Sequence, residues 1–363
     1  MNIIIFLIIL LVLVIVHEFG HFFTAKKFGI RVDEFGFGFP PRLFGIKKGE
    51  TEYTFNLLPL GGFVKIFGEN PDDENIHGPD ARRSFVNKPK WQQAVVLVAG
   101  VFANFILAWL LFSFGFMSGF PTSVGSEIGG ENIKDVNLFV VSVVPESRAE
   151  KAGLRSGDKI VFVKKGELST KYISPETVRS LVRDGGEIEI GYLRGRNNIQ
   201  NNIKIIPEKN EEGVQMIGIA MDQIGIAKLP ILGAFKEGIR LTLHITKSTA
   251  VGLYALILDS LKGKGSIESI TGPVGMVGIV GDAYQFGFVY LLSFAALISI
   301  NLAIINLIPF PALDGGRLFF LLIEKIKGSR INPRTTNIAN TVGFSLLILL
   351  MIFVTYSDIV KLL

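Results

Sequence analysis

The six residues Val16-His17-Glu18-Phe19-Gly20-His21 lie in the second half of an apolar segment that begins at Ile3. On a helix, His17 and His21 are four residues apart and share one face, so both imidazoles can reach a single metal ion. Glu18 beside them can reach a water molecule bound to that ion. This spacing is the His-Glu-x-x-His pattern of zinc hydrolases, and it predicts a metal-dependent hydrolytic site.

The motif is predicted to lie inside a membrane. The uninterrupted apolar run from Ile3 to Val16 has 14 residues, and a helix of that length is about 21 Å long, too short for roughly 30 Å of hydrocarbon. A helix that continues to Ala25 reaches about 34 Å and can span, which places the motif within the bilayer near one end. Polar side chains at that depth are costly and usually functional. The alternative is that they only pair with neighbouring helices.

The composition indicates a membrane protein without thiol chemistry. The chain has 363 residues, 49% of them hydrophobic, no cysteine and a formal net charge of +5. The lack of cysteine excludes disulfides and thiolate catalysis. Because Lys and Arg residues cluster beside apolar segments, we interpret the positive charge as a topology signal and expect no nucleic-acid partner. The polar motif interrupts the core that a signal peptide would need, so we expect the first segment to be retained.

Four segments are predicted to span the membrane. They cover approximately residues 3–25, 94–120, 286–308 and 338–356. The loops after the first and third spans are rich in Lys and Arg, whereas the N-terminus before Ile3 has none and only Lys361 follows the last span. The positive-inside rule therefore predicts that both basic loops are cytoplasmic and that both termini face outward.

The third span supplies a candidate for a third metal ligand. The first and third spans both run from outside to inside in this topology, so their C-terminal ends lie at the same depth. The third span ends in Asn306-Leu-Ile-Pro309-Phe-Pro311-Ala-Leu-Asp314-Gly315-Gly316, where prolines and glycines predict irregular backbone. Asp314 is therefore the best-placed third ligand. The alternative is a helix terminator with a solvated aspartate.

The first cytoplasmic loop contains β-forming sequence. Residues 52–67 are predicted as two short β stretches around a Pro/Gly turn, and their apolar character favours a hairpin that dips towards the active site. Its edge could accept an unwound substrate as an added strand. The same residues fit a purely structural hairpin equally well. Upstream, Gly36 to Pro41 is predicted as an apolar turn or re-entrant loop.

Two further regions lie between the second and third spans. Residues 127–223 have the composition of a soluble α/β module, with strands predicted near 138–144, 187–193 and 203–206 and a helix at 176–182. The topology places this module outside. Residues 230–264 mix apolar and charged side chains without an apolar stretch long enough to span, and are predicted as one or two helices on the outer membrane surface.

These motifs resemble the site-2 protease family of intramembrane zinc metalloproteases, in its bacterial RseP type (regulator of sigma-E protease). The resemblance rests on His-Glu-Phe-Gly-His in the first span and on residues 306–316 at the end of the third. Shorter motifs that share it are Phe85-Val-Asn-Lys-Pro-Lys-Trp91, Ala99-Gly100-x-x-x-Asn104, residues 149–160 and Gly272-Pro-Val-Gly. Together they cover nearly the whole chain in matching topology.

The resemblance implies roles for individual residues. His17, His21 and Asp314 would bind Zn2+, and Glu18 would be the catalytic base. Asn301 and Asn306 match positions that handle the substrate. The segment from Tyr53 to Phe67 would be a membrane re-entrant β loop.

The external module resembles a circularly permuted PDZ domain. The segment Met216-Ile217-Gly218-Ile219 takes the place of the loop that binds a peptide C-terminus. The best-known members of this type carry two such modules in tandem, and this chain has room for one.

The predicted fold class is a polytopic α-helical membrane protein with four transmembrane helices, a membrane-associated β-hairpin and an inserted α/β PDZ domain. Residues 1–125 would hold the first two transmembrane helices with the cytoplasmic loop, and 126–224 the extracytoplasmic PDZ domain. Residues 225–284 would form amphipathic interfacial helices, and 285–363 the last two transmembrane helices.

The predicted function is regulated intramembrane proteolysis in the bacterial inner membrane. Its substrates would be single-span membrane proteins, such as anti-sigma factors or signal-peptide remnants, met within the lipid bilayer. One alternative is a divalent-metal transporter that uses His17, His21 and Asp314 as its transport site. Another is an inert membrane-tethered PDZ scaffold. Neither alternative needs Glu18 as a base, so the glutamate argues for the protease.

Overall fold

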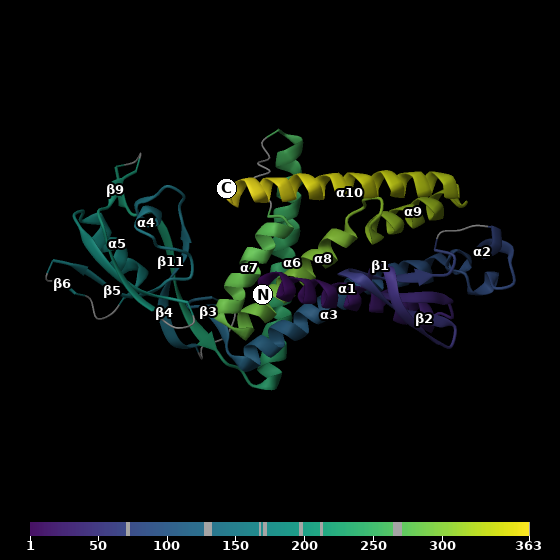
Figure 1. The fold of residues 1–363 in the computed structure, drawn as a ribbon, viewed down its shortest axis with the longest axis horizontal. Helices are drawn as coiled ribbons and strands as arrows, with labels where there is room; N and C mark the ends of the chain where they lie inside the picture. The colour runs from purple at the N-terminus through teal and green to yellow at the C-terminus, as the bar shows by residue number, and fades with distance from the viewer. Residues whose placement is uncertain are drawn as a thin grey trace. The chain divides into compact units, whose positions relative to one another are not determined.

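The chain folds into two compact units. The computed structural model describes residues 1–69, 73–126, 133–166, 168–169, 173–195, 199–210, 213–263 and 271–362. The first unit comprises Met1–Phe112, Ile239–Tyr284 and Leu291–Leu363, and the second comprises Ser113–Gly238 with Gln285–Tyr290. The first is mainly helical and the second mainly β, with the elements labelled in Figure 1.

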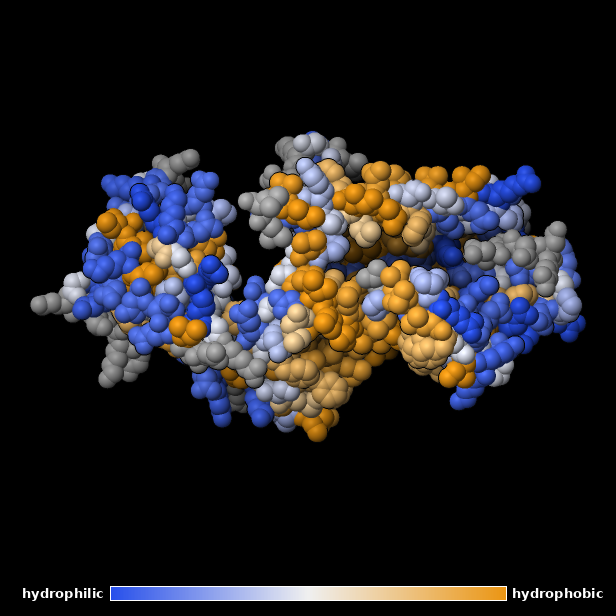
Figure 2. All heavy atoms as spheres, viewed as in Figure 1, coloured by the Kyte–Doolittle hydropathy of each residue, from blue (hydrophilic) through white to orange (hydrophobic). Residues whose placement is uncertain are grey.

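Four long helices correspond to the four predicted spans. They are α1 (Asn2–Lys27), α3 (Lys90–Ser118), α8 (Phe288–Leu307) and α10 (Pro333–Leu362). Each is long and apolar enough to cross a membrane, and their exposed surface is largely apolar, as Figure 2 shows in orange. Apolar surface of this extent is stable in lipid rather than in water. The chain is therefore a multi-pass membrane protein.

The described residues contain a fifth helix that meets the same criterion. Helix α6 (Ile231–Leu261) is continuous over 31 residues, in the region where one or two helices on the outer membrane surface were predicted. The prediction held that charged residues leave no apolar stretch long enough to span, but the helix as a whole is long and apolar enough to do so. In Figure 1, α6 runs across the direction of α10 rather than along it.

Two shorter helices flank α8. Helix α7 (Pro273–Phe286) precedes it and α9 (Asp314–Lys327) follows it. The sequence did not predict α9, because its prolines and glycines indicated irregular backbone. That irregular stretch is confined to a turn after α8, where Ala312 has a φ of 75°. Helix α9 then ends at Gly328, a left-handed C-cap that suits glycine.

Strands β1 (Val32–Lys48) and β2 (Thr51–Ile66) form an antiparallel hairpin. The two strands meet at a turn between Lys48 and Thr51. The register also shows that β1 turns back between Phe37 and Arg42, where a turn was predicted, and that residues 51–66 contain two β stretches as predicted. The prediction that these two stretches pair with each other is wrong. Between β2 and α3 lie three short elements: α2 (Asp73–His77), η1 (Ala81–Arg83) and η2 (Phe85–Asn87).

A non-local strand separates the two β stretches that were predicted to pair. Phe35 of β1 pairs with both Tyr53 and Val64 of β2, so the first part of β1 lies between the two ends of β2. Register shifts along the ladder let the strands bend back in this way. A local turn signal in the sequence cannot reveal which strand fills the space between its two arms.

The second unit is built on one antiparallel sheet. Its strand order is β3-β11-β4-β5-β7-β8, with β6 paired to β5. The sheet strands are β3 (Phe120–Ser123), β4 (Ile133–Val143), β5 (Lys159–Lys165), β6 (Leu168–Ser169), β7 (Ile188–Arg194), β8 (Ile199–Ile205) and β11 (Ile219–Ala227). The other elements are α4 (Arg148–Lys151), α5 (Pro175–Arg183), β9 (Glu208–Lys209) and β10 (Gln215–Met216).

Helix α5 covers the core of this sheet. It starts where the Ser174 side chain accepts a hydrogen bond from the Thr177 N–H, with Pro175 in the first turn. Val178 and Leu181 of α5 are buried in one apolar cluster with residues of the sheet such as Ile190. Burial of each such side chain stabilises the fold by about 1.5–3 kcal/mol, so the second unit has a core of its own.

Candidate active site

The two histidines of α1 meet at a buried point of the helical unit. His17 and His21 are each 6% exposed, and their Nε2 atoms are 3.1 Å apart. They share a face because an α-helix completes a turn in about 3.6 residues. The local spacing of the motif thus places both rings where the sequence predicted.

Asp314 at the start of α9 joins them. Its Oδ2 is 3.0 Å from His17 Nε2 and 3.3 Å from His21 Nε2, although 297 residues separate Asp314 from His17. The turn before α9 depends on glycine, since a Cβ on Gly315 would lie 2.2 Å from the carbonyl oxygen of Ile308. The structure therefore brings together the three side chains predicted as ligands.

The spacing of these three atoms suits a tetrahedral zinc ion. Zinc binds imidazole nitrogen and carboxylate oxygen at roughly 2.0–2.2 Å, so two ligand atoms of one ion are roughly 3.3 Å apart. The observed distances of 3.0, 3.1 and 3.3 Å agree with this. Three protein ligands leave a fourth position open, as in catalytic zinc sites. Within the described residues, this is the only group of His, Asp and Glu arranged to hold a metal ion.

The hydrogen bonding of His21 also supports a metal site. Its Nδ1 is 2.8 Å from the backbone carbonyl of Val96, which can only accept, so Nδ1 carries the proton and Nε2 of the neutral ring has the lone pair. That lone pair faces the Asp314 carboxylate at 3.3 Å. Two acceptors in contact are favourable only when they share a cation, and a zinc ion bound by both would be such a cation.

Helix α3 packs closely behind the histidines. A Cβ on Gly100 would lie 2.3 Å from His21 Nε2, and a Cβ on Gly20 would lie 2.3 Å from the carbonyl oxygen of Ala99. Glycine at both positions therefore lets α1 and α3 approach at the site. The sequence did not predict a role for these glycines, which stand within the short motifs of the first and second spans.

Glu18 lies between the cluster and the β1–β2 hairpin. Its carboxylate interacts with the backbone N–H of Val64 in β2 and with the charges of His17, His21 and Asp314. A carboxylate held in this way next to the metal position can accept a proton from a water molecule there. The geometry agrees with the role predicted for Glu18.

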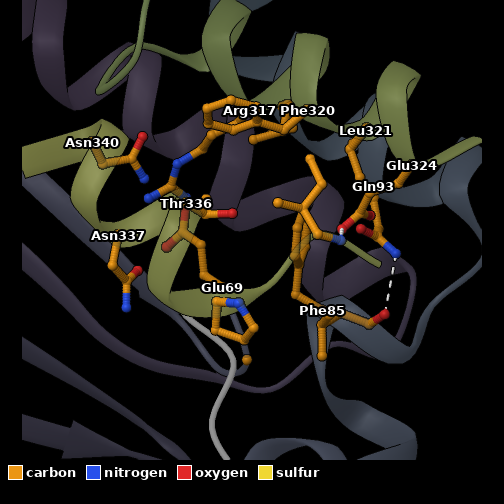
Figure 3. A pocket seen from close by; sticks show the side chains of 15 residues that line it. Glu69, Phe85, Gln93, Arg317, Phe320, Leu321, Glu324, Thr336, Asn337 and Asn340 are labelled. Carbon is orange, nitrogen blue, oxygen red and sulfur yellow. Dashed lines mark hydrogen bonds and ion pairs between the residues drawn. The ribbon is translucent and has the colours of Figure 1, made fainter. Parts of the chain in front are cut away.

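Arg317 is a charged residue near the site that the sequence did not predict. It lies three residues after Asp314 on α9, interacts electrostatically with Glu18 and forms an ion pair with Glu69, which follows β2. Figure 3 shows Arg317 and Glu69 among the residues around a cavity of about 80 Å³. The ion pair links the helix of Asp314 to the end of the hairpin. Nothing local in the sequence connects two residues 248 positions apart.

Asn301 and Asn306 both lie on α8 and are partly buried. Because they are five residues apart, their side chains leave the helix in directions that differ by about 140°, so they do not share one face. Ser299 of α8 bonds to α3: its Oγ donates to the backbone carbonyl of Asn104 at 2.9 Å.

The segment Met216 to Ile219 lies in the second unit, beside a groove. The groove runs along α5 and the start of β11 and is lined in part by Val144, Arg179, Val182, Arg183, Met216 and Met221. Gly218 has a φ of +82°, and a Cβ there would lie 2.3 Å from that of Ser147. Glycine is therefore required where the chain turns into β11.

Three side chains able to hold a metal ion, beside a glutamate and within a bundle of long apolar helices, are typical of a membrane-embedded metallohydrolase. The model of the family described as Peptidase family M50 matches residues 5–350. The chain belongs to this family, the site-2 proteases, and is an intramembrane zinc metalloprotease.

Bacterial zinc metalloproteases are similar to the chain over almost their whole length. Zinc metalloprotease RasP of Geobacillus kaustophilus is 29% identical, over 99% of this chain and 98% of the relative. Zinc metalloprotease RasP of Oceanobacillus iheyensis is 31% identical, over 97% of each chain. Regulator of sigma-W protease RasP of Bacillus subtilis is 30% identical, over 99% of each. This membership favours proteolysis over the alternatives of metal transport and an inert scaffold.

Proposed function

We propose that His17, His21 and Asp314 bind the zinc ion and that Glu18 is the catalytic base. The observation that carries this proposal is the convergence of three ligand atoms, 3.0 to 3.3 Å apart, from α1 and α9. When bound, zinc acts as a Lewis acid that acidifies water and polarises a carbonyl group. Glu18 accepts the proton of the attacking water and then donates it to the leaving amine. The nearby backbone N–H of Val64 favours the ionised form of this carboxylate, which accepts the proton.

The proposed substrates are transmembrane segments of single-span membrane proteins, such as anti-sigma factors or signal-peptide remnants. A site buried among apolar helices suits a substrate that is itself apolar. One similar protein is named regulator of sigma-W protease, which supports a role in regulated proteolysis. A helical substrate must unwind first, because its carbonyls are occupied by its own hydrogen bonds.

The β1–β2 hairpin is the proposed element that holds the unwound substrate. Its tip and edge expose large apolar side chains, among them Leu43, Ile46 and Leu57, and such a surface favours membrane association. The contact between Val64 and Glu18 places β2 beside the base. An extended substrate could pair with the hairpin as an added strand, with the amides of Asn301 or Asn306 as further partners.

We infer that four helices span and that α6 lies on the membrane surface. The helices α1 and α8 run in the same direction, because the end of α8 leads through one turn to Asp314 beside His17 and His21. An odd number of crossings must therefore lie between α1 and α8. Helix α3 supplies one crossing and α8 follows as the next, so a crossing by α6 would need a return by α7. With 14 residues, α7 is only about 21 Å long and too short to return.

This topology supports the proposed localisation. The protein would lie in the bacterial inner membrane with both termini and the β-rich unit outside and the basic loops in the cytoplasm. The proposed division is 1–125, 126–224, 225–284 and 285–363, although the sheet of the second unit includes β3 before and the end of β11 after the limits of 126–224.

The second unit is proposed to be a PDZ domain that binds a peptide C-terminus. The groove beside Met216, Ile217, Gly218 and Ile219 offers apolar side chains for the last residue of a peptide. Arg179 and Arg183 on α5 supply positive charge for carboxylates. Strand β3 pairs only with Ile224–Ala227, so within the described residues the edge of β11 before Ile224 is left for an added peptide strand.

The test of the protease assignment is Glu18→Gln, which keeps the shape of the side chain and removes the base. Purified wild-type protein should cleave a tagged single-span substrate, and the variant should cleave about 100- to 10,000-fold more slowly. Bound zinc should be unchanged in the variant. A zinc chelator should stop wild-type cleavage, and added zinc should restore it.

Glu176→Gln on the exposed side of α5 makes the same chemical change in the second unit and should leave cleavage unchanged. Wild-type cleavage by the Glu18→Gln protein would overturn the assignment of the base.

A further inference from the structure

Asn104 is a buried amide on α3 whose partners the protease assignment does not use. Its side chain is fully buried, and one end of the amide, recorded as Nδ2, lies 3.3 Å from His17 Nδ1. The other end, recorded as Oδ1, has no hydrogen-bond partner among the residues that the structure describes. A buried amide of this kind inside an apolar bundle is costly.

The protonation of His17 decides which end of the amide faces the ring. The Nε2 of His17 is the atom that converges with His21 Nε2 and Asp314 Oδ2, so a metal ligand needs its lone pair on Nε2 and its proton on Nδ1. An Nδ1–H can only donate. The atom of Asn104 that faces it must then be Oδ1, which is reached by turning the amide by half a turn.

Turning the amide exchanges which of its ends is unpaired. The tautomer of His17, and not the number of hydrogen bonds, therefore selects the orientation. With the recorded orientation, Nδ2 would donate to Nδ1 and the proton of His17 would lie on Nε2, where it blocks metal binding.

His21 provides an internal comparison on the same helix. Its Nδ1 donates to the backbone carbonyl of Val96 at 2.8 Å, which leaves Nε2 free for the metal. Helix α3 thus offers one partner to each histidine, a backbone carbonyl for His21 and a side-chain amide for His17. Ser299 on α8 donates to the backbone carbonyl of Asn104 at 2.9 Å and ties this part of α3 to α8.

We propose that Asn104 is a positioning residue for His17. Its Oδ1 accepts the hydrogen bond from His17 Nδ1–H, keeps the proton away from Nε2 and aims the lone pair at the position shared with His21 and Asp314. Partners of this kind tune metal affinity by about 10- to 100-fold. The inference rests on the proposed role of His17 as a zinc ligand.

The experiment compares two substitutions in the full-length protein in detergent. Asn104→Leu removes the acceptor, and Asn104→Asp keeps one. The zinc dissociation constant of the metal-free protein is measured by competition with a chromophoric chelator. Asn104→Leu should weaken zinc binding about 10- to 100-fold, whereas Asn104→Asp should stay close to the wild type. Ser299→Ala removes the neighbouring hydrogen bond to the backbone, leaves the amide in place, and should also stay close to the wild type.

A second readout follows the tautomer itself. The chain has four histidines, so selective 15N labelling gives few signals, and His17→Ala identifies the one of interest. With zinc bound, His17 should carry its proton on Nδ1 in the wild type and in Asn104→Asp.

Wild-type zinc affinity in Asn104→Leu, or equal loss in Asn104→Leu and Asn104→Asp, would overturn the proposal. Failure of the underlying assignment gives a different result, because then His17→Ala would itself bind zinc as tightly as the wild type. If Asn104→Leu does not fold, the tautomer of His17 in the wild type and the zinc affinity of Asn104→Asp still test the proposal.

Discussion

Asp314 and Asp158 are carboxylates held largely away from solvent, one in each unit, and the two units satisfy them differently. Asp158 is 1% exposed, and its two oxygens accept hydrogen bonds from the Arg194 guanidinium at 2.7 and 2.6 Å. Asp314 faces the imidazoles of His17 and His21 at 3.0 and 3.3 Å. The charge of Asp158 is balanced by a cation of the protein, while that of Asp314 faces the proposed metal position.

The difference separates a structural carboxylate from a functional one. The hydrogen bond to Asp158 raises the pKa of the Arg194 guanidinium above its usual value, so that pair is a fixed ion pair that links β5 to β7. Imidazoles that bind a metal ion through Nε2 are neutral, so in the proposed zinc site the metal ion would supply the positive charge beside Asp314. Burial alone therefore does not distinguish a metal-binding carboxylate from a structural one. The charge of the groups that face the carboxylate distinguishes them.

The largest effect is expected from Asp314→Asn. The amide has the same shape but no charge, and amide oxygen is a weak zinc ligand. Zinc affinity should fall by more than the roughly 10- to 100-fold that loss of an outer partner costs, and cleavage should be lost. Metal analysis of the purified protein and a cleavage assay measure the two effects.

Thermal unfolding of the second unit serves as the control for this variant and should not change. Full zinc content in Asp314→Asn would remove Asp314 from the ligand set and with it the contrast between the two carboxylates.

Only part of the site could be predicted from the sequence. His17, Glu18 and His21 follow from helical periodicity, which is local, and Asp314 follows from counting membrane crossings. The roles of Val96 and Gly100 depend on which face of α3 packs against α1. Side-chain packing across the bundle decides which face of α3 meets α1, and no periodic pattern in the sequence reveals that face.

The fold, too, could be predicted from the sequence only in part. The long helices were predicted from apolar length, which is a property of each segment alone. The pairing of Phe35 with both Tyr53 and Val64 joins three segments, and a turn signal at one of them does not specify it. The α6 region was predicted to have no stretch long enough to span, because charged residues interrupt its apolar run, although the whole helix is long and apolar enough to cross a membrane.

A smaller effect, in the other unit, is expected from Asp158→Asn. The substitution leaves the Arg194 guanidinium without its charged partner, and loss of one member of a buried pair costs about 3 kcal/mol. Amide hydrogen exchange in β4, β5 and β7 of the full-length protein should accelerate accordingly.

Zinc affinity of Asp158→Asn should equal that of the wild type, because the metal cluster lies in the helical unit. A fall in zinc affinity comparable to that of Asp314→Asn would show that the two carboxylates do not have separate roles.

The smallest effect is expected from Glu208→Gln, which removes a carboxylate that is neither buried nor near the metal. Glu208 pairs with Arg148 at 2.6 Å, but the two side chains are 57% and 55% exposed. Water and salt screen such a pair, so its loss should cost less than about 1 kcal/mol. Thermal unfolding of the second unit at low and high salt measures this, and the small difference from wild type should vanish at high salt. A loss as large as that of Asp158→Asn would mean that distance between charges, rather than burial, sets the strength of these pairs.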